Sequence, residues 1–336
     1  MPPVTTLTLE SRPSFAVVAD PSIYWAAMTR AREMFVVDAF SDRPFCGNPA
    51  VIVPDADGLS DHAMQALAAE LRMEAGFVLP ATAENADLRL RFFSPGAEVD
   101  VSGHVTVATY AALQAAGKLP GGARAEVGKP RRIRQQARAG VMPVDLSLEK
   151  EGVAPSVTLD LGKPVFGAAL DRGEVIEALR VGAGALSPGP APRAVTCGVS
   201  LAVCAMADSA ALAAAVPDMA RLATFSRRRG VLGIVAFAMP GLHPQSALTS
   251  RFFFPAVGPD EDPVSGAALA AVCAYGVRER LLMCVGEASF QTDQGHSLGR
   301  PNRAQVDVRT EAGQIASIKV RGRGVVVMRG EFTPAE

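Results

Sequence analysis

Short runs in which apolar residues alternate with polar ones, or stand together, occupy most of the chain. Most of these runs are four to nine residues long, and glycine, proline or acidic turns separate them, which is typical of β-strands. The pattern predicts strands at 34–40, 51–57, 75–79, 88–93, 143–148, 156–161, 194–206, 231–239, 303–309, 315–321 and 324–329.

Helical periodicity is rarer along the chain. Ser60 can cap a helix that carries apolar residues at Met64, Leu67, Ala68 and Leu71. Two further helices, at 105–117 and 266–281, are almost wholly apolar and are therefore expected to be buried, and a fourth is predicted at 211–222. Many strands and few buried helices indicate an α+β fold with two similar halves rather than an alternating, doubly wound sheet.

One motif occurs in both halves. RFFSPGAEVDVSGH at 91–104 is echoed by RFFFPAVGPDEDPVSGA at 251–267, with 11 positions from Arg to Ser in the first copy and 14 in the second. In each copy a strand ends near a proline, an acidic loop follows, and Ser-Gly opens an apolar helix. Two helix N-termini that face each other would offer unpaired N–H groups to one carboxylate or oxyanion. Alternatively, both serines are only helix caps in a duplicated domain.

The acidic residues of this motif allow two interpretations. Glu98, Glu261 and Asp262 each precede a predicted helix, where the helix dipole favours negative charge whatever the function. A structural role is therefore an alternative to a catalytic one for each of them.

Composition and charge narrow the class of protein. The chain has 336 residues, of which 49% are hydrophobic and 20% charged, and its formal net charge is −1. This balance favours a well-packed globular protein and disfavours nucleic acid or an anionic membrane as a partner. No uncharged apolar run reaches the length of a membrane span, and the five cysteines are odd in number and form no C-x-x-C pair. We expect a cytoplasmic protein with reduced thiols and no structural metal.

Five landmarks in order resemble the phenazine-biosynthesis PhzF-like family, relatives of diaminopimelate epimerase and proline racemase. They are VVDAFSDRPFCGNPAVIV, EAGFV at 74–78, RFFSPGAEVDVSGH, DEDPVSGAA at 260–268 and LGRPN at 298–302. The resemblance implies two pseudo-symmetric domains, each a mostly antiparallel sheet wrapped around a central helix, with the active site between them. We expect an N-terminal extension at 1–33, a first domain at 34–150 plus 322–331, and a second at 151–321.

The same resemblance assigns site residues. It implies that Glu74 is the acid/base carboxylate and that His104 and Asp262 are the other catalytic residues. The predicted substrate-binding residues are Asn48, Ser102, Gly103, Ser265 and Gly266. The family uses no cofactor, and no metal ligand is expected. Without the resemblance, Glu74 would be read as a solvated residue and His104 as a helix-cap histidine.

The chain departs from the family pattern at three places. Met73 and Ala75 flank Glu74 where the family has small polar residues, which leaves the groups that orient Glu74 unassigned. Ser102 and Ser265 stand where racemase and epimerase relatives carry catalytic cysteines, so a two-thiol racemase is not expected. Ala267 replaces a serine, which indicates a substrate different from that of the phenazine enzyme.

The leading functional prediction is a cofactor-independent isomerase of a biosynthetic pathway that moves a proton, and with it a double bond, in a small carboxylated or amino-acid-like metabolite. Epimerisation or dehydration on the same fold is one alternative, and a non-catalytic binding homologue is another. The expected partner is a small-molecule substrate, with a homodimer as an open alternative to a monomer.

Overall fold

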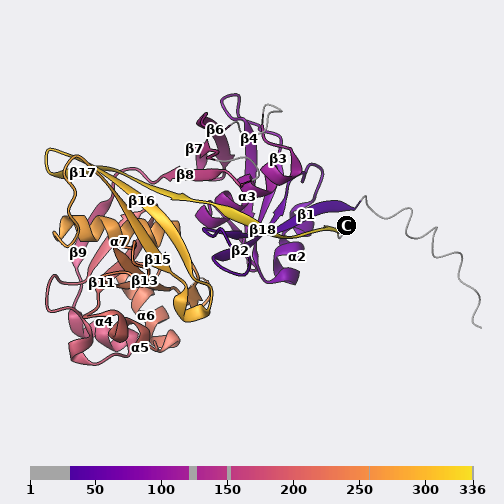
Figure 1. Ribbon diagram of the computed structural model, residues 1–336. Coiled ribbons are helices and arrows are strands. Elements are labelled where there is room, and N and C mark those ends of the chain that lie inside the picture. Colours follow the sequence, from indigo (N-terminus) through magenta and orange to yellow (C-terminus); the bar gives the residue numbers. More distant parts are fainter. Residues whose placement is uncertain (1–30, 121–126, 150–152, 257, 335–336) are drawn as a thin grey trace, which may run out of the picture.

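A computed structural model describes residues 31–120, 127–149, 153–256 and 258–334. Most of the predicted N-terminal extension, residues 1–30, lies outside the described residues. The prediction of a strand-dominated α+β fold is confirmed (Figure 1).

The strands are β1 (Arg32–Ala39), β2 (Asn48–Val53), β3 (Glu74–Leu79), β4 (Leu88–Phe93), β5 (Glu98–Val99), β6 (Arg131–Ala137), β7 (Gly140–Ser147), β8 (Ser156–Asp160), β9 (Val165–Ala169), β10 (Arg193–Cys197), β11 (Val199–Ala205), β12 (Ile234–Ala238), β13 (Leu248–Phe253), β14 (Glu261–Asp262), β15 (Glu287–Gln294), β16 (Asn302–Glu311), β17 (Gln314–Gly322) and β18 (Gly324–Phe332). The helices are α2 (Asp61–Leu71), α3 (Gly103–Ala116), α4 (Arg172–Leu179), α5 (Ser209–Ala214), α6 (Met219–Arg229) and α7 (Gly266–Arg278), with short 3-10 turns at Ala183–Ala185 and His296–Leu298.

The two halves of the chain repeat one connectivity. In the first half, β2 pairs in parallel with β3, β3 pairs antiparallel with β4, and β4 pairs in parallel with β6. In the second half, β11, β12, β13 and β15 repeat the same order and directions. We call the part from β1 to β8 with β18 the first half, and the part from β9 to β17 the second half.

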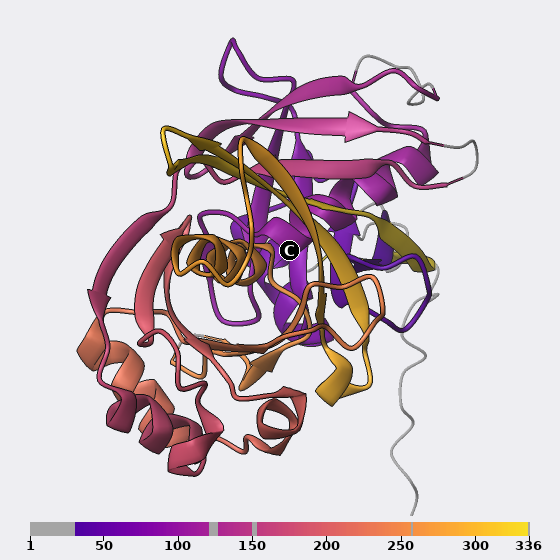
Figure 2. The same cartoon turned by 60° about the vertical axis from the view of Figure 1, so that its left-hand side comes forward.

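Each sheet curls around one apolar helix. α3 packs against β1, β2 and β18, and α7 packs against β10, β16 and β17. Figure 2 shows α7 with strands of the second half around it. Nine of the 14 residues of α3 and ten of the 13 residues of α7 are buried, which explains why neither helix has a polar face.

One strand pairing connects the halves, and the last strand returns from the second half to the first. The last strand, β18, returns to the first half and runs antiparallel to β1, from Arg32 opposite Phe332 to Ala39 opposite Gly324. β8 pairs with β7 of its own half and with β17 of the other. The 18 strands therefore form one continuous hydrogen-bonded sheet.

Local sequence explains most helix boundaries. The Ser60 side chain accepts from the Ala63 N–H at 3.1 Å, as predicted, and α2 ends at Arg72 in a left-handed conformation. The helix predicted at 211–222 is instead two helices. Pro217 follows α5, and the Asp218 side chain caps α6 by accepting from the Arg221 N–H at 3.1 Å.

Candidate active site

Glu74 is the first residue of β3, at the point where the chain leaves α2. β3 runs directly against α3: a Cβ on Gly76 would lie 2.7 Å from Val105 Cγ1 and 3.1 Å from Thr109 Oγ1. Glycine at position 76 is therefore required for this close approach. The approach brings the start of β3 beside the start of α3, so that Glu74 meets the first turn of that helix.

The Glu74 carboxylate lies beside His104. His104 Nε2 is 3.7 Å from Glu74 Oε2, and the two side chains are 12% and 28% exposed. On its other side, His104 Nδ1 is 3.2 Å from Ser102 Oγ. Among the described residues, no side chain donates a hydrogen bond to Glu74, and His104 is the one neighbour at ion-pair distance.

Asp262 approaches from the second half of the molecule. It lies in the short strand β14, and its main-chain carbonyl accepts from Gln294 Nε2 at 2.9 Å. Asn48 Nδ2, at the start of β2, donates to Asp262 Oδ1 at 2.6 Å and to the Val264 carbonyl at 3.0 Å. Asn48 therefore fastens the first half to the segment that leads into α7.

The surroundings set the charge of two of these groups. Burial raises the pKa of the Asp262 carboxyl well above its ordinary value, the charge of Glu74 raises it further, and the Asn48 hydrogen bond opposes both. Burial lowers the pKa of His104, and the Glu74 carboxylate partly offsets this. The fold thus favours a protonated Asp262 and a neutral imidazole beside Glu74.

The two Ser-Gly pairs open α3 and α7, but they are not equivalent. Ser265 Oγ caps α7 by accepting from the Ala268 N–H at 3.3 Å, whereas Ser102 makes no such bond to α3. A Cβ on Gly103 or on Gly266 would find its nearest atoms 3.5 Å away, which is ordinary contact. Packing within the chain therefore does not account for glycine at these two positions.

The sequence analysis assigned no role to the ion pair between Asp38 and Arg300. Arg300 Nη2 lies 2.6 Å from Asp38 Oδ1, and Arg300 Nε donates to the Gly47 carbonyl at 2.8 Å. The Asp38 side chain, only 3% exposed, also accepts from the Phe45 N–H at 2.6 Å. Arg300 belongs to the second half, so this ion pair is a second connection between the halves. Gly47, whose carbonyl Arg300 binds, directly precedes Asn48. An acid inside the apolar run of β1 was the available signal.

The acidic residues of the repeated motif divide between the two interpretations. Arg91 holds Glu98 with two hydrogen bonds of 2.7 and 2.8 Å, and Arg251 holds Glu261 with two of 2.9 and 2.7 Å. Glu98 and Glu261 are therefore structural partners of the repeated arginines. Asp262 has no cationic partner among the described residues and lies with the candidate catalytic groups.

Comparison with known proteins identifies the family. The family model for phenazine biosynthesis-like proteins matches residues 37–330. The chain belongs to this family. It is 34% identical to an uncharacterized isomerase of Deinococcus radiodurans over 312 residues, which cover 91% of this chain and 96% of that one. Its fold matches that of a PhzF-family phenazine biosynthesis protein of Bacillus anthracis, with a TM-score of 0.79, 24% identity and coverage of 90% and 99%. It also matches a hydroxyproline epimerase of Agrobacterium vitis, with a TM-score of 0.61, 15% identity and coverage of 91% and 92%.

The relatives in sequence support an isomerase type of enzyme family, and the likeness to the epimerase structure shows the fold. Among the residues that the structure describes, no three His, Cys, Asp or Glu side chains are grouped so as to hold a metal ion. No helix in the described ranges is long and apolar enough to cross a membrane.

Proposed function

We propose that the protein is a cofactor-independent isomerase that moves a proton within a small carboxylated or amino-acid-like metabolite bound between the two halves. The observation that carries the proposal is the meeting of Glu74 and His104 from the first half with the buried Asp262 from the second. A site that combines a carboxylate such as Glu74 with a carboxyl of raised pKa such as Asp262 is suited to general acid–base catalysis, because one group can accept a proton while the other donates one.

In the proposed reaction Glu74 removes a proton from a carbon activated by a neighbouring carbonyl or carboxyl group. The electron pair left behind is delocalised as a dienolate over a C=C bond already present in the substrate, and the proton on Glu74 then returns to the far carbon of that bond, so that the double bond moves and nothing is consumed. The protonated Asp262 can donate a hydrogen bond to the developing oxyanion, and the main-chain N–H groups that open α3 and α7 can supply others. His104 positions the Glu74 carboxylate and, through Ser102, is itself held in place.

Epimerisation is a second candidate, favoured by one observation. Glu74 and Asp262 come from opposite halves of the molecule, and an epimerase needs two acid/base groups on opposite faces of one carbon. Deuterium would then enter at the carbon whose configuration inverts. Double-bond migration would place deuterium at a different carbon from the one that lost hydrogen, and dehydration would release water.

The test is proton exchange in deuterated buffer. A panel of amino acids, hydroxyproline and unsaturated carboxylic acids is incubated with the protein and followed by NMR for loss of C–H signals. Since a positioned base typically contributes about 10² to 10⁴-fold, Glu74→Gln should slow exchange by at least that order. Glu84→Gln, an exposed carboxylate in the turn before β4, is the matched control and should behave as wild type. If Glu74→Gln exchanges a substrate at the wild-type rate, Glu74 is not the base.

A further inference from the structure

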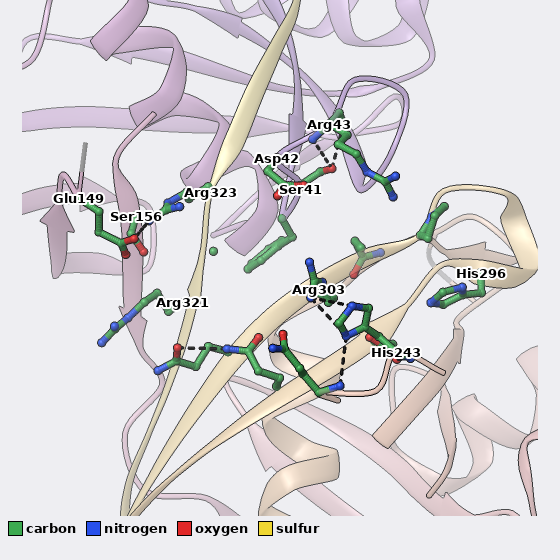
Figure 3. Close-up of a pocket in the computed structure, with 18 residues that line it drawn as sticks. Ser41, Asp42, Arg43, Glu149, Ser156, His243, His296, Arg303, Arg321 and Arg323 are labelled. Atoms are coloured by element: carbon green, nitrogen blue, oxygen red, sulfur yellow. Dashed lines mark hydrogen bonds and ion pairs between the residues drawn. The ribbon is translucent and has the colours of Figure 1, made fainter. Parts of the chain in front are cut away.

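A cavity of about 990 Å³ lies between the halves. Glu74, His104 and Asp262 do not line it (Figure 3). Phe40 and Asn302 form its wall toward the active site, because the Phe40 ring packs against the start of α7 and Asn302 Nδ2 donates to the Pro263 carbonyl at 2.9 Å. The cavity therefore lies behind the catalytic groups.

Basic side chains surround this cavity on several sides. In Figure 3, Arg321 and Arg323 lie on one side and Arg303 with His243 on another, while Arg43 comes from the loop between β1 and β2. Arg323 pairs with Glu149, and Arg321 Nη2 lies 3.3 Å from Asp307 Oδ2.

Two guanidinium groups of the cavity are left without a carboxylate. Within the described ranges, no Asp or Glu lies at ion-pair distance from Arg43 or Arg303, and both side chains are exposed. Asp42 is the one unpaired exposed carboxylate of the lining, because Asp293 is fully buried. The exposed part of the lining therefore has an excess of unpaired positive charge.

The wall that carries Arg303 is held in a fixed shape. Asp293 Oδ2 accepts from the His243 N–H at 2.9 Å, and Asp293 Oδ1 accepts from Ser246 Oγ at 2.5 Å. His243 Nδ1 accepts from the Gln245 N–H at 3.2 Å, and Arg303 Nη1 lies 3.3 Å from both ring nitrogens. The Arg303 guanidinium thus contacts the His243 ring, and the buried Asp293 holds His243 in place by accepting from its main-chain N–H.

Two buried polar atoms of the same lining have no partner. Asn302 Oδ1 and Arg321 Nε make no hydrogen bond to any residue that the structure describes. Asn302 is only 5% exposed, and its Nδ2 donates to the Pro263 and Arg300 carbonyls. A buried donor or acceptor without a partner costs about 1–3 kcal/mol. Each of these atoms exposes less than 1 Å², so a small movement of the side chains would be needed before they offered one acceptor and one donor to a ligand.

We propose that this cavity binds a small anion with at least two oxyanion groups and a hydroxyl, such as a polycarboxylate or a phosphate ester. Two groups are required because the arginines stand on different walls, and one phosphate or carboxylate is too small to fill a space of the size usual for whole metabolites. Arg303 and Arg321 would bind the oxyanions, and Asn302 Oδ1 would accept from the hydroxyl. This site is independent of the proposed isomerase reaction.

Calorimetric titration with citrate and with pyrophosphate tests the proposal, at constant ionic strength because surface charges are screened by salt. Saturable binding is expected, and Arg303→Gln and Arg321→Gln should each weaken it by at least about tenfold, the effect of losing one charge-assisted hydrogen bond. Arg303→Lys keeps the charge and should lose less. Arg132→Gln, which changes an exposed arginine of β6, is the control for net charge.

The pattern of binding decides the result. Citrate alone would point to a polycarboxylate and pyrophosphate alone to a phosphate ester, and either supports the site. His104→Asn should bind the probe as wild type does. The proposal is overturned if wild type binds neither probe, if the Arg303 and Arg321 variants bind as tightly as wild type, or if only His104→Asn loses binding, which would place the anion in the active site.

Discussion

The two halves of the molecule are built alike but contribute different chemistry. Ser102, Gly103 and His104 open α3, and Ser265, Gly266 and Ala267 open α7 at the equivalent place. The sheet register makes Asp262 the counterpart of Val99, since they face Phe252 and Phe92 respectively. By the same register Gly233 stands at the position of Glu74.

This difference teaches which parts of a repeated motif belong to folding. The arginine and the glutamate are repeated because they bond to each other, and each arginine also lies over a phenylalanine, Arg91 over Phe93 and Arg251 over Phe253. The candidate catalytic groups occur once. The repeated arginine and glutamate therefore belong to the scaffold, whereas Glu74, His104 and Asp262 have no counterpart of the same type in the other half.

The largest effect should come from removing the repeated arginines, and it should be unequal. Arg251 Nη1 donates to the carbonyls of Leu212, Ala213 and Ala215 in addition to holding Glu261, whereas Arg91 adds only the exposed Asp61. Arg251→Met should therefore lower the free energy of unfolding by about 3 kcal/mol. Arg91→Met should lower it by about 1.5 kcal/mol.

Urea unfolding measures both variants. Arg132→Met is the control, because it removes only an exposed ion pair with Asp145, and exposed ion pairs contribute little to stability. Equal losses for Arg91→Met and Arg251→Met would show that the extra carbonyl contacts of Arg251 contribute nothing to stability.

The sequence predicts the scaffold of the two halves better than it predicts the site. The apolar helices and the strand that precedes each were predictable because their patterns are local. The strands predicted from the sequence do not include β6, because arginines dominate its sequence. Its inward positions Ile133 and Gln135 are in fact buried, and Gln135 accepts from the Tyr110 hydroxyl at 3.0 Å. β9 and α4 were missed because short, half-exposed segments carry little periodicity.

Only part of the candidate active site could be predicted from the sequence, for a related reason. Glu74, His104 and Asp262 were named through resemblance to a family, and no local pattern connects them. The Asp38–Arg300 pair joins residues 262 positions apart, and its partners become neighbours only after both sheets have formed. Local sequence cannot encode such a contact.

The second prediction concerns Asp262, which has no acidic counterpart in the first half. Its raised pKa means that the folded protein keeps this proton to a higher pH than the unfolded chain does. As pH rises above the ordinary carboxyl value, the unfolded state loses the proton first, so that this group makes the fold progressively less stable. Asp262→Asn removes the effect, and the variant should gain stability relative to wild type from about pH 4 upward, by about 1.4 kcal/mol per unit of pKa shift.

Urea unfolding of wild type and of Asp262→Asn across this pH range shows whether the stability difference between them grows with pH, as expected. Asp145→Asn is a control for which the opposite pH dependence is expected. Arg132 lowers the pKa of Asp145, so that the charged form of Asp145 stabilises the fold above the ordinary carboxyl pKa. That variant should lose a little stability at neutral pH and nothing in acid. A stability difference for Asp262→Asn that does not change with pH would mean that Asp262 is ionised in the folded protein.

The smallest expected effect separates the two serines that open the central helices. Ser265 Oγ satisfies an N–H group of α7, and loss of such a cap costs about 1 kcal/mol, so Ser265→Ala should lower the free energy of unfolding by that amount. Ser102 Oγ makes no cap and contacts His104 instead, so Ser102→Ala should leave stability nearly unchanged but shift the NMR signals of the His104 ring. Ser265→Ala should leave those ring signals in place. If both variants lose equal stability and neither moves the His104 signals, the two helix starts are equivalent, and the functional asymmetry between the halves does not extend to their serines.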